Sequence, residues 1–361
     1  MPVETVEVPV DHPYPVVVGA GLDLGEILAD SLEPGLCAIF TDSTVGPHFA
    51  ASVRDILEEG GWRVAGILEV PSGESSKSME NYAEALRRLA RLGLTRDGTL
   101  FALGGGVVGD LGGFVAATYM RGIDLVMLPT SLLAMVDSAV GGKVGVDLPE
   151  GKNLVGAFVR PRLVAADLRW LGTLPAPEIS NGLAETIKMG LLSGADYFDD
   201  LGMIGAARGG DIDALQTLVL HSVRFKARVV AEDELEGGLR AILNYGHTIG
   251  HALEAAAGYD LPHGTAVAAG MLAAARLSRE RFGTDLTGVH EDLIGAAGLP
   301  LRVPNVGVER ALKAMAHDKK RSARDAPVKH RFVLLEDIGK PVRNVPVSED
   351  EARRAIGAVL E

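Results

Sequence analysis

The sequence predicts a two-domain α/β protein: an N-terminal α/β domain with a parallel sheet over residues 1–174, followed by a mainly α-helical domain over residues 175–361. At 361 residues the chain is long enough for two domains. In the first half, short apolar runs alternate with amphipathic helical stretches, which is the pattern of a parallel sheet. Beyond Pro175 and Pro177 the periodicity is helical almost to the end of the chain.

The composition indicates an acidic protein with a sizeable core. Hydrophobic residues make up 47% of the chain and the net charge is -13, which is the wrong sign for binding nucleic acid or an anionic membrane surface. We expect neither partner, so an anionic substrate must be held by a local basic pocket. Cys37, the single cysteine, lies in an apolar run and is expected to be a buried core residue in a reducing compartment. The N-terminus does not look like a signal peptide and no apolar run reaches about 18 residues, so we expect a cytoplasmic protein.

Short apolar segments of the N-terminal half are expected to form strands. They are residues 4–10, 15–18, 36–41, 64–70, 99–103, 124–128 and 163–167. The spacing of Tyr82, Leu86, Leu89 and Leu92 predicts a helix that buries one face against a sheet. The carboxyl ends of parallel strands meet at one edge of the sheet, where such proteins bind ligands.

Polar residues after these strands are candidates for a ligand site. Asp42 either accepts hydrogen bonds from a ribose or caps the following helix. Glu74 and Lys77 stand at a loop-to-helix junction, where they either cap the helix or contact a nucleotide. Lys143 and Lys152 lie in glycine-flanked loops and are either phosphate ligands or solvated surface lysines.

A glycine-rich loop follows the strand expected at residues 99–103. Gly104, Gly106 and Gly109 match G-x-G-x-x-G, in which main-chain N–H groups and a helix N-terminus can bind a pyrophosphate. The motif comes after at least two strand–helix units, and Asp42 precedes it instead of following it. We therefore expect a phosphate-binding loop of a nucleotide fold other than the usual dinucleotide fold.

The helical half contains several charged residues at helical spacing. Glu185 and Lys188 lie one turn apart, and Lys226 lies in a long expected helix. Arg240 precedes His247 by seven residues and is expected two turns away on a similar face of one helix.

Three further segments have simpler interpretations. The acidic run over residues 232–236 is expected to be a solvated loop. The basic stretch over residues 317–331 is either a mobile loop that supplies a phosphate ligand or a solubilising segment. Ser348 and Glu351 form a capping box before an amphipathic helix.

The histidines indicate a metal site. His247 and His251 are four residues apart, so both imidazoles leave the same face of a helix. Two polar residues on a half-buried helix would show the same spacing. Glu185, His247 and His263 could supply three ligands to a catalytic divalent metal with an open position, which leaves His251 free for acid–base work.

Several motifs occur in order between about Asp42 and Lys340. They are Gly104–Asp110, Tyr119–Gly122, Val136–Lys143, Gly151–Asn153, Ala184–Lys188, Asn244–His251, His263–Gly264 and Asp318–Lys320. With this combination the chain resembles the 3-dehydroquinate synthases of the sugar phosphate cyclase family. The resemblance implies a nucleotide-binding domain, a mainly helical metal-binding domain and a homodimer.

The resemblance also implies the ligands of each site. Glu185, His247 and His263 would bind Zn²⁺, or Co²⁺ in its place. Contacts with NAD are implied for Asp42, Glu74, Lys77, Gly105, Gly106, Asp110, Thr130, Ser131, Lys143 and Lys152. The implied substrate is 3-deoxy-D-arabino-heptulosonate 7-phosphate, a sugar phosphate. Its phosphate would be bound by Lys143, Lys152, Asn153, Asn244 and either Lys319 or Lys320, with Arg121 of the partner subunit. Lys226 and Arg240 would bind its carboxylate.

A reaction sequence follows from the same resemblance. NAD oxidises the substrate at C5, phosphate is eliminated, hydride returns to C5, and an intramolecular aldol step closes the ring of 3-dehydroquinate. His251, Lys188 and Asp137 would hold and shuttle protons.

Other functions are weighed against this one. Cyclases whose substrates lack a carboxylate have no use for both Lys226 and Arg240, whereas an amino-substituted substrate would fit equally well. A metal-dependent polyol dehydrogenase shares the fold but does not need so many phosphate and carboxylate ligands. A non-enzymatic scaffold requires the loss of a catalytic position, and we find none lost.

Overall fold

The computed structural model describes residues 2–316 and 330–361, and these form two compact units. Unit 1 comprises Met1–Leu174 and Lys226–Leu235, and unit 2 comprises Pro175–Phe225 and Glu236–Glu361. Unit 1 contains a mainly parallel sheet and unit 2 is mostly helical, which confirms the predicted fold class. The segment Lys226–Leu235 follows the sequence-based boundary at residue 174 and yet belongs to unit 1.

Unit 1 is built on a sheet of seven strands among the described residues. In spatial order they are β1 (Glu4–Val8), β2 (Tyr14–Gly19), β9 (Leu163–Asp167), β6 (Asp124–Pro129), β5 (Thr99–Gly104), β3 (Leu36–Asp42) and β4 (Arg63–Val70). β1 is antiparallel to β2, and the other neighbours are parallel. All of the strands expected in this half are present, with small differences at their ends.

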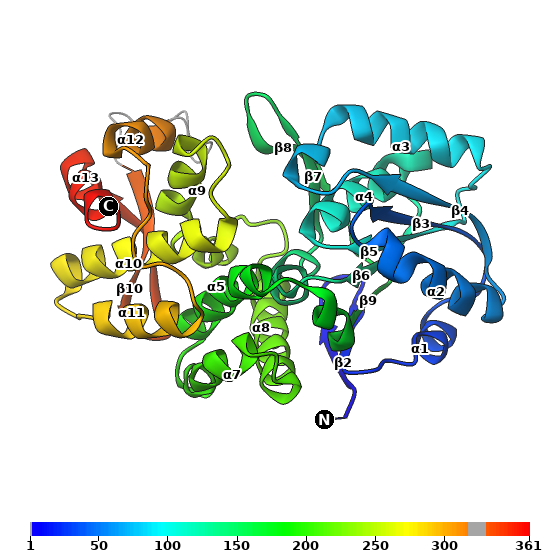
Figure 1. The fold of residues 1–361 in the computed structure, drawn as a ribbon, viewed down its shortest axis with the longest axis horizontal. Helices are drawn as coiled ribbons and strands as arrows, with labels where there is room; N and C mark the ends of the chain where they lie inside the picture. Colours follow the sequence, from blue (N-terminus) through cyan, green and yellow to red (C-terminus); the bar gives the residue numbers. More distant parts are fainter. Residues whose placement is uncertain (1, 317–329) are drawn as a thin grey trace. The chain divides into compact units, whose positions relative to one another are not determined.

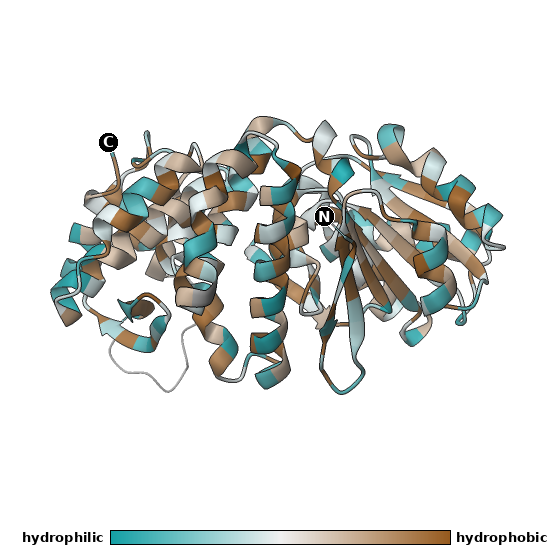
Figure 2. Cartoon of the chain, turned by 90° about the horizontal axis from the view of Figure 1, so that it is seen from below, coloured by the Kyte–Doolittle hydropathy of each residue, from teal (hydrophilic) through white to brown (hydrophobic). Residues whose placement is uncertain are grey.

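Helices cover both faces of this sheet (Figure 1). They are α1 (Leu24–Ser31), α2 (Gly46–Glu59), α3 (Met79–Arg91) and α4 (Gly106–Thr118). Side chains alternate between the faces of a strand, so Cys37 and Ile39 join the core beneath α1 and α2. Phe40 instead meets α4 at Gly112, where a Cβ atom would lie 2.9 Å from its ring. The strands are largely brown in Figure 2, as expected for burial on both faces. The predicted burial of Cys37 is confirmed.

A second, two-stranded sheet corrects one expectation. We expected Lys143 and Lys152 in loops, but they lie in β7 (Lys143–Leu148) and β8 (Gly151–Phe158), which pair antiparallel. Apolar β7 residues pack on α4, where Gly113 makes room for Val144. The glycines around this hairpin resemble loop residues in sequence, although they permit the close contact of the two strands.

Unit 2 is built from helices and a two-stranded ribbon. Its main elements are α5 (Ala176–Ser193), α6 (Ala195–Phe198), α7 (Ile204–Arg208), α8 (Ile212–Glu232, whose residues from Lys226 belong to unit 1), α9 (His247–Ala256), α10 (His263–Phe282), α11 (Thr287–Ala296), α12 (Val308–Ala316), β10 (His330–Asp337), β11 (Lys340–Val347) and α13 (Glu349–Gly357). The capping box of Ser348 and Glu351 is confirmed at the start of α13.

The start of α9 differs from the prediction. We expected Arg240 and His247 on one helix, but Leu239–Asn244 forms a 3₁₀ turn and α9 begins only at His247. Gly246 breaks the helix with a φ of 79° and packs so closely on α10 that a Cβ atom would lie 2.6 Å from Met271 Cγ. Glycine is required here for both its backbone conformation and its size.

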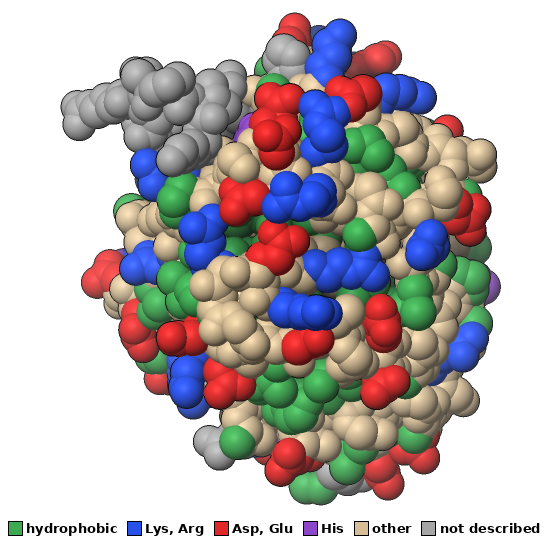
Figure 3. Space-filling view, turned by 90° about the vertical axis from the view of Figure 1, so that its left-hand side faces the viewer, with side chains coloured by type: hydrophobic (Ala, Val, Ile, Leu, Met, Phe, Trp, Pro, Cys, Tyr) green, Lys and Arg blue, Asp and Glu red, His purple; other side chains and the backbone are tan. Residues whose placement is uncertain are grey.

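The surface of unit 2 carries mixed charges. Figure 3 shows acidic and basic side chains interspersed over one face. Ion pairs of unit 2 such as Arg281–Glu351 and Arg354–Glu280, each at 3.0 Å, are of this kind. Opposite charges so close together largely cancel, so the described part of this face offers no broad basic area to a polyanion. No helix in the described ranges combines the length and apolarity needed to cross a lipid bilayer.

Candidate active site

The carboxyl edge of the unit 1 sheet gathers several predicted nucleotide ligands. After β3 the chain adds β4 on one side and then β5 on the other, so the strand order reverses between β3 and β5. Ligands of open α/β sheets bind at such reversal points. Asp42 ends β3, the glycine loop follows β5, and Thr130 and Ser131 follow the neighbouring β6. The fold thus places five predicted NAD ligands, Asp42, Gly105, Gly106, Thr130 and Ser131, along one edge.

The glycine loop has the form of an anion-binding turn. α4 begins at Gly106 with Gly105 as its N-cap, and N–H groups of a first helical turn have no partner within the helix. A Cβ atom on Gly105 would lie 3.3 Å from Ser131 Oγ, and one on Gly106 would lie 3.1 Å from Ser138 Oγ. Larger side chains would therefore crowd the loop, whereas glycine leaves its backbone accessible.

Asp42 and Ser131 also have local structural roles. Asp42 Oδ1 accepts hydrogen bonds from the N–H groups of Thr44 and Val45 at 2.8 and 2.9 Å. Ser131 Oγ accepts one from the N–H of Ala134 at 3.3 Å. These bonds hold the turn before α2, whose N-cap is Val45 without a side-chain hydrogen bond, so Asp42 does not cap the helix, and its contact with a ribose remains a prediction.

Lys77 is the centre of a polar network in unit 1. Lys77 is 4% exposed, and its ammonium donates to Asp110 Oδ2 at 2.8 Å and to Asn153 Oδ1 at 2.5 Å. Burial lowers the pKa of Lys77, but the Asp110 and Glu74 carboxylates raise it above its usual range. Burial raises the pKa of Asp110, and Lys77 opposes that rise. Lys77 therefore holds a buried positive charge that joins α4 to the β7–β8 hairpin.

The same network holds the tip of the hairpin. Lys152 Nζ lies 3.3 Å from Glu74 Oε1, and the N–H of Asn153 donates to Asp147 Oδ1 at 2.7 Å. Asn153 has a left-handed φ of 52°, so these bonds maintain a backbone conformation that few non-glycine residues adopt. Sequence analysis missed Asp147, whose position between two apolar strand residues was the available signal.

Asp137, which is half-buried, pairs with the buried Lys226, also in unit 1. Asp137 lies in a π-helical turn, Ala134–Ser138, and both its main-chain oxygen and its Oδ1 accept hydrogen bonds from Lys226 Nζ at 2.6 Å. Lys226 is 5% exposed. The sequence predicts separate roles for the two residues, proton transfer and carboxylate binding, whereas the structure joins them in one contact.

Lys143 and Arg121 are exposed. Arg121 has a φ of 69° and follows Met120, whose φ is 49°. Within the described residues, the Arg121 side chain has no hydrogen-bond or ion-pair partner. Lys319 and Lys320 lie outside the described residues.

In unit 2 the three predicted metal ligands meet. Ligand atoms of Glu185, His247 and His263 lie within 4.8 Å of one another. Glu185 Oε1 is 3.4 Å from His247 Nε2 and 3.3 Å from His263 Nε2, and the Glu185 side chain is 0% exposed. Within the described chain neither Glu185 oxygen has a hydrogen-bond partner of good geometry, although Lys188 forms an ion pair with Oε2. A divalent cation would satisfy this buried carboxylate.

Each histidine is oriented through its other ring nitrogen. His247 Nδ1 lies 3.1 Å from the carbonyl oxygen of Tyr245, and His263 Nδ1 lies 3.0 Å from Glu254 Oε1. Because both partners accept, the Nδ1 atoms donate and the Nε2 atoms face Glu185. Carboxylates and carbonyls orient histidine ligands in the same way in zinc sites. Sequence analysis missed this role of Glu254, although its position seven residues after His247 places it on the same helix face.

Burial and neighbouring charges shift the pKa values of Glu185, His247 and His263. Burial raises the pKa of Glu185, but the Lys188 ammonium and the His247 imidazole hold it well below its usual range. Burial and the same ammonium lower the pKa of His247 well below its usual range. For His263, burial is outweighed by Glu185 and Glu254, which raise its pKa to about 10. A cation at Nε2 must therefore displace a proton from His263.

The other predicted site residues of unit 2 differ in exposure. Lys188 is 1% exposed and Arg240 is 2% exposed, whereas His251 is exposed, with its ring centroid 5.1 Å from that of His247. Asn244 donates to Glu236 Oε1 at 3.1 Å. Asn181 on α5 accepts a hydrogen bond from the N–H of Gly264, which anchors the start of α10 next to the helix of Glu185.

Residues 233–236 of the acidic run form a loop, as expected, but Glu234 and Glu236 are half-buried instead of solvated. Glu234 binds Arg160 through two hydrogen bonds of 2.6 and 2.8 Å, and Glu236 binds Asn244. At least two of the four acidic residues of this run therefore have specific partners.

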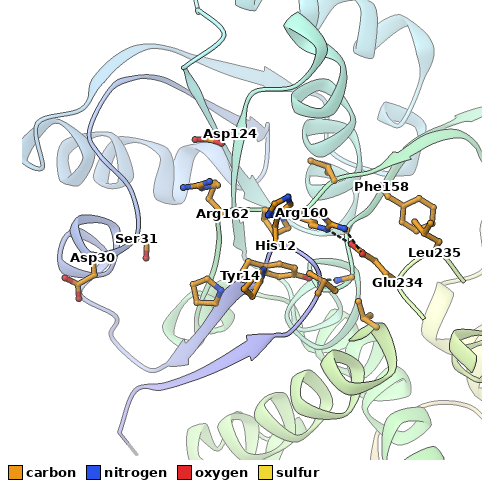
Figure 4. A pocket seen from close by; sticks show the side chains of 18 residues that line it. His12, Tyr14, Asp30, Ser31, Asp124, Phe158, Arg160, Arg162, Glu234 and Leu235 are labelled. Atoms are coloured by element: carbon orange, nitrogen blue, oxygen red, sulfur yellow. Dashed lines mark hydrogen bonds and ion pairs between the residues drawn. The ribbon is translucent and has the colours of Figure 1, made fainter. Parts of the chain in front are cut away.

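A cavity of about 980 Å³ in unit 1 contains none of the predicted ligands (Figure 4). Tyr14, Asp124 and Arg162 line it at or just before the amino ends of β2, β6 and β9. These strands are parallel, so the cavity lies at the edge opposite the glycine loop. Figure 4 shows the Arg160–Glu234 pair beside Phe158 and Leu235. Because ligands of parallel sheets bind at carboxyl ends, the cavity is not the candidate site.

Known proteins with similar sequences and structures share one family. The model of the 3-dehydroquinate synthase N-terminal domain matches residues 67–181, and that of the C-terminal domain matches residues 182–321. A curated 3-dehydroquinate synthase from Acidithiobacillus ferrooxidans is 45% identical over 356 residues, which cover 96% of each chain.

Two solved structures are similar over almost their whole length. One is a 2-deoxy-scyllo-inosose synthase complexed with carbaglucose-6-phosphate, NAD⁺ and Co²⁺, with a TM-score of 0.87 and 27% identity over 98% of this chain and 99% of that one. The other is a 2-epi-5-epi-valiolone synthase from Streptomyces hygroscopicus with NAD⁺ and Zn²⁺, with a TM-score of 0.86 and 28% identity over 96% of each chain. With both family models matching and the metal-ligand group in place, the chain belongs to the 3-dehydroquinate synthase family.

Proposed function

We propose that the protein converts 3-deoxy-D-arabino-heptulosonate 7-phosphate into 3-dehydroquinate and phosphate. The observation that carries the proposal is the buried group of Glu185, His247 and His263, with both outer imidazole nitrogens already bonded. It occurs in a chain that belongs to the family with this activity.

The proposed cofactors are NAD and one Zn²⁺ or Co²⁺ ion, as in the two similar cyclases. When bound, they would supply reversible oxidation of a substrate alcohol and polarise its hydroxyl groups. NAD is assigned to Asp42, Glu74, Lys77, Asp110 and the glycine loop, with Thr130, Ser131, Lys143 and Lys152 as further ligands. The ion is assigned to Glu185, His247 and His263, whose set of one carboxylate and two imidazoles is typical of catalytic zinc.

The remaining assignments concern the substrate. Lys226 and Arg240 are nearly buried cations, and buried cations favour a carboxylate that replaces their hydration. Lys226 already binds Asp137, so substrate binding would redistribute this contact and leave Asp137 next to the reacting hydroxyls. His251 is exposed beside His247 and Lys188 is buried beside Glu185, and we assign proton transfer to His251, Lys188 and Asp137.

The phosphate ligands are proposed to be Lys143, Lys152, Asn153 and Asn244, with one of Lys319 or Lys320. Arg121 of the partner subunit completes this set in the proposed cytoplasmic homodimer. Arg121 is exposed and has no partner among the described residues, which supports a role in contact with another molecule. Size-exclusion chromatography with light scattering tests the dimer.

An amino-substituted substrate is the second candidate. Lys226 and Arg240 would bind its carboxylate equally well, so the buried cations do not separate the two substrates. A polyol dehydrogenase is less consistent with these cations, since its substrate carries neither carboxylate nor phosphate.

The test is phosphate release from the proposed substrate with catalytic amounts of NAD⁺ and Zn²⁺, while NADH absorbance is followed in parallel. We expect phosphate release without accumulation of NADH, and loss of activity with a chelator. Steady NADH accumulation without phosphate release would indicate a dehydrogenase. Turnover only of the amino-substituted analogue would indicate the second substrate.

A further inference from the structure

Tyr245 and His290 form a buried pair next to the metal ligand His247, and the reaction proposed above gives this pair no role. Tyr245 and His290 are each 0% exposed, and Tyr245 Oη lies 2.8 Å from His290 Nε2. His290 Nδ1 lies 2.8 Å from the carbonyl oxygen of Leu286. A carbonyl can only accept, so Nδ1 carries the proton and Nε2 accepts from the tyrosine hydroxyl. Burial lowers the pKa of His290 to about 4, which keeps the ring neutral.

The other end of Tyr245 contacts a metal ligand. Its main-chain oxygen accepts the hydrogen bond of His247 Nδ1 at 3.1 Å, and this bond turns His247 Nε2 toward Glu185. Tyr245 is extended and Gly246 is left-handed, so no helical hydrogen bonds fix this carbonyl in the way they fix those within α9. The side chain of Tyr245 is thus the anchor of the peptide that orients His247.

We infer that His290 and Tyr245 are positioning residues, which hold the His247 imidazole ready to bind the divalent ion. This inference rests on the proposed function for the identity of the ion. A phenyl ring would fill the same space, but it lacks the hydroxyl whose hydrogen bond to His290 fixes the position of the ring. His290 acts from α11, outside every motif that resembles the family.

The test compares metal binding in four variants of the full chain. Tyr245→Phe removes the hydroxyl, which also lies 3.4 Å from the carbonyl oxygen of Met271, and His290→Leu removes only its shorter bond to His290. His290→Gln keeps an acceptor for the tyrosine hydroxyl. Tyr197→Phe is the matched control, because Tyr197 is a buried tyrosine of unit 2 whose hydroxyl lies 2.7 Å from Ser222 Oγ. Co²⁺ affinity is measured by competition with a chelating dye on metal-free protein, together with the visible spectrum of the Co²⁺ complex and the thermal midpoint.

We expect Tyr245→Phe and His290→Leu to weaken Co²⁺ binding about 10-fold, at the lower end of the effect of residues behind metal ligands. Their Co²⁺ spectra should change, and His290→Gln should recover most of the affinity. Tyr197→Phe should lower the thermal midpoint and leave the affinity and spectrum unchanged.

Wild-type affinity and spectrum in Tyr245→Phe, with only a lower midpoint, would overturn the inference and leave the proposed function intact. A wild-type chain that binds no Co²⁺ would overturn both.

Discussion

The central buried charge is negative in the metal-ligand group of unit 2 and positive in the Lys77 network of unit 1. In unit 2 a buried carboxylate, Glu185, faces imidazole nitrogens whose orientation is already set. In unit 1 the buried ammonium of Lys77 already has carboxylate and amide partners. The first arrangement is suited to a cation, whereas the second joins α4 to the β7–β8 hairpin.

The largest effect is expected from the metal group. Glu185→Gln keeps the shape of the side chain but removes the charge, so Co²⁺ affinity should fall by more than the roughly 100-fold seen for residues behind ligands. Phosphate release should become undetectable. Glu178→Gln, on the same helix but exposed, is the control and should bind Co²⁺ normally. Retention of Co²⁺ binding by Glu185→Gln would remove Glu185 from the ligand set.

Substitution of Lys77 should mainly lower the free energy of unfolding. Lys77→Met leaves Asp110 without its cation, and we expect a loss of about 3 kcal/mol in the free energy of unfolding. NAD affinity should fall as well, while Co²⁺ affinity should not change. Urea denaturation measures the loss, and adding Asp110→Asn should restore part of it. Equal stability of the single and double variants would show that the pair is not coupled.

We expect the free energy of unfolding to depend on pH through His290 of unit 2. Its pKa is about 4 in the folded chain and 6.5 in the unfolded one, so the unfolded chain takes up the proton first as the pH falls. The stabilising contribution is complete above pH 6.5 and is lost as the pH falls toward 4, by roughly 3 kcal/mol in total. Urea midpoints of metal-free wild type and His290→Gln across this range test the prediction. Parallel pH curves for the two proteins would contradict it.

The smallest effect is expected from the capping box of α13, which belongs neither to the metal-ligand group nor to the Lys77 network. Ser348→Ala removes the capping box of α13 and should cost about 1 kcal/mol. NAD and Co²⁺ affinities should stay unchanged in titrations of the variant. A change in either affinity would mean that the C-terminal helix influences a site that we treat as independent.

Features that depend on local spacing along the chain could be predicted from the sequence. His247 and His251 are close in sequence and helical spacing fixes their geometry, so the ligand set with Glu185 and His263 could be proposed. The strands were predictable because burial on both faces leaves continuous apolar runs. The hairpin of Lys143 and Lys152 was missed because its glycines look like loop residues.

Contacts between distant residues could not be predicted. Lys77 meets Asp110 and Asn153, and Lys226 meets Asp137, only after the chain has folded. The break between Arg240 and His247 depends on the contact of Gly246 with α10, which no local pattern reveals. Glu254 lay on the predicted helix face, but its role required the position of His263.

The most direct test of the account is a titration of metal-free protein with Co²⁺, in which phosphate release and the Co²⁺ spectrum are followed together. We predict that both rise in parallel and stop at one ion per chain, and that Glu185→Gln shows neither. Full phosphate release from metal-free protein, or activity that continues to rise after the spectrum has saturated, would contradict the claim that Glu185, His247 and His263 form the catalytic metal site.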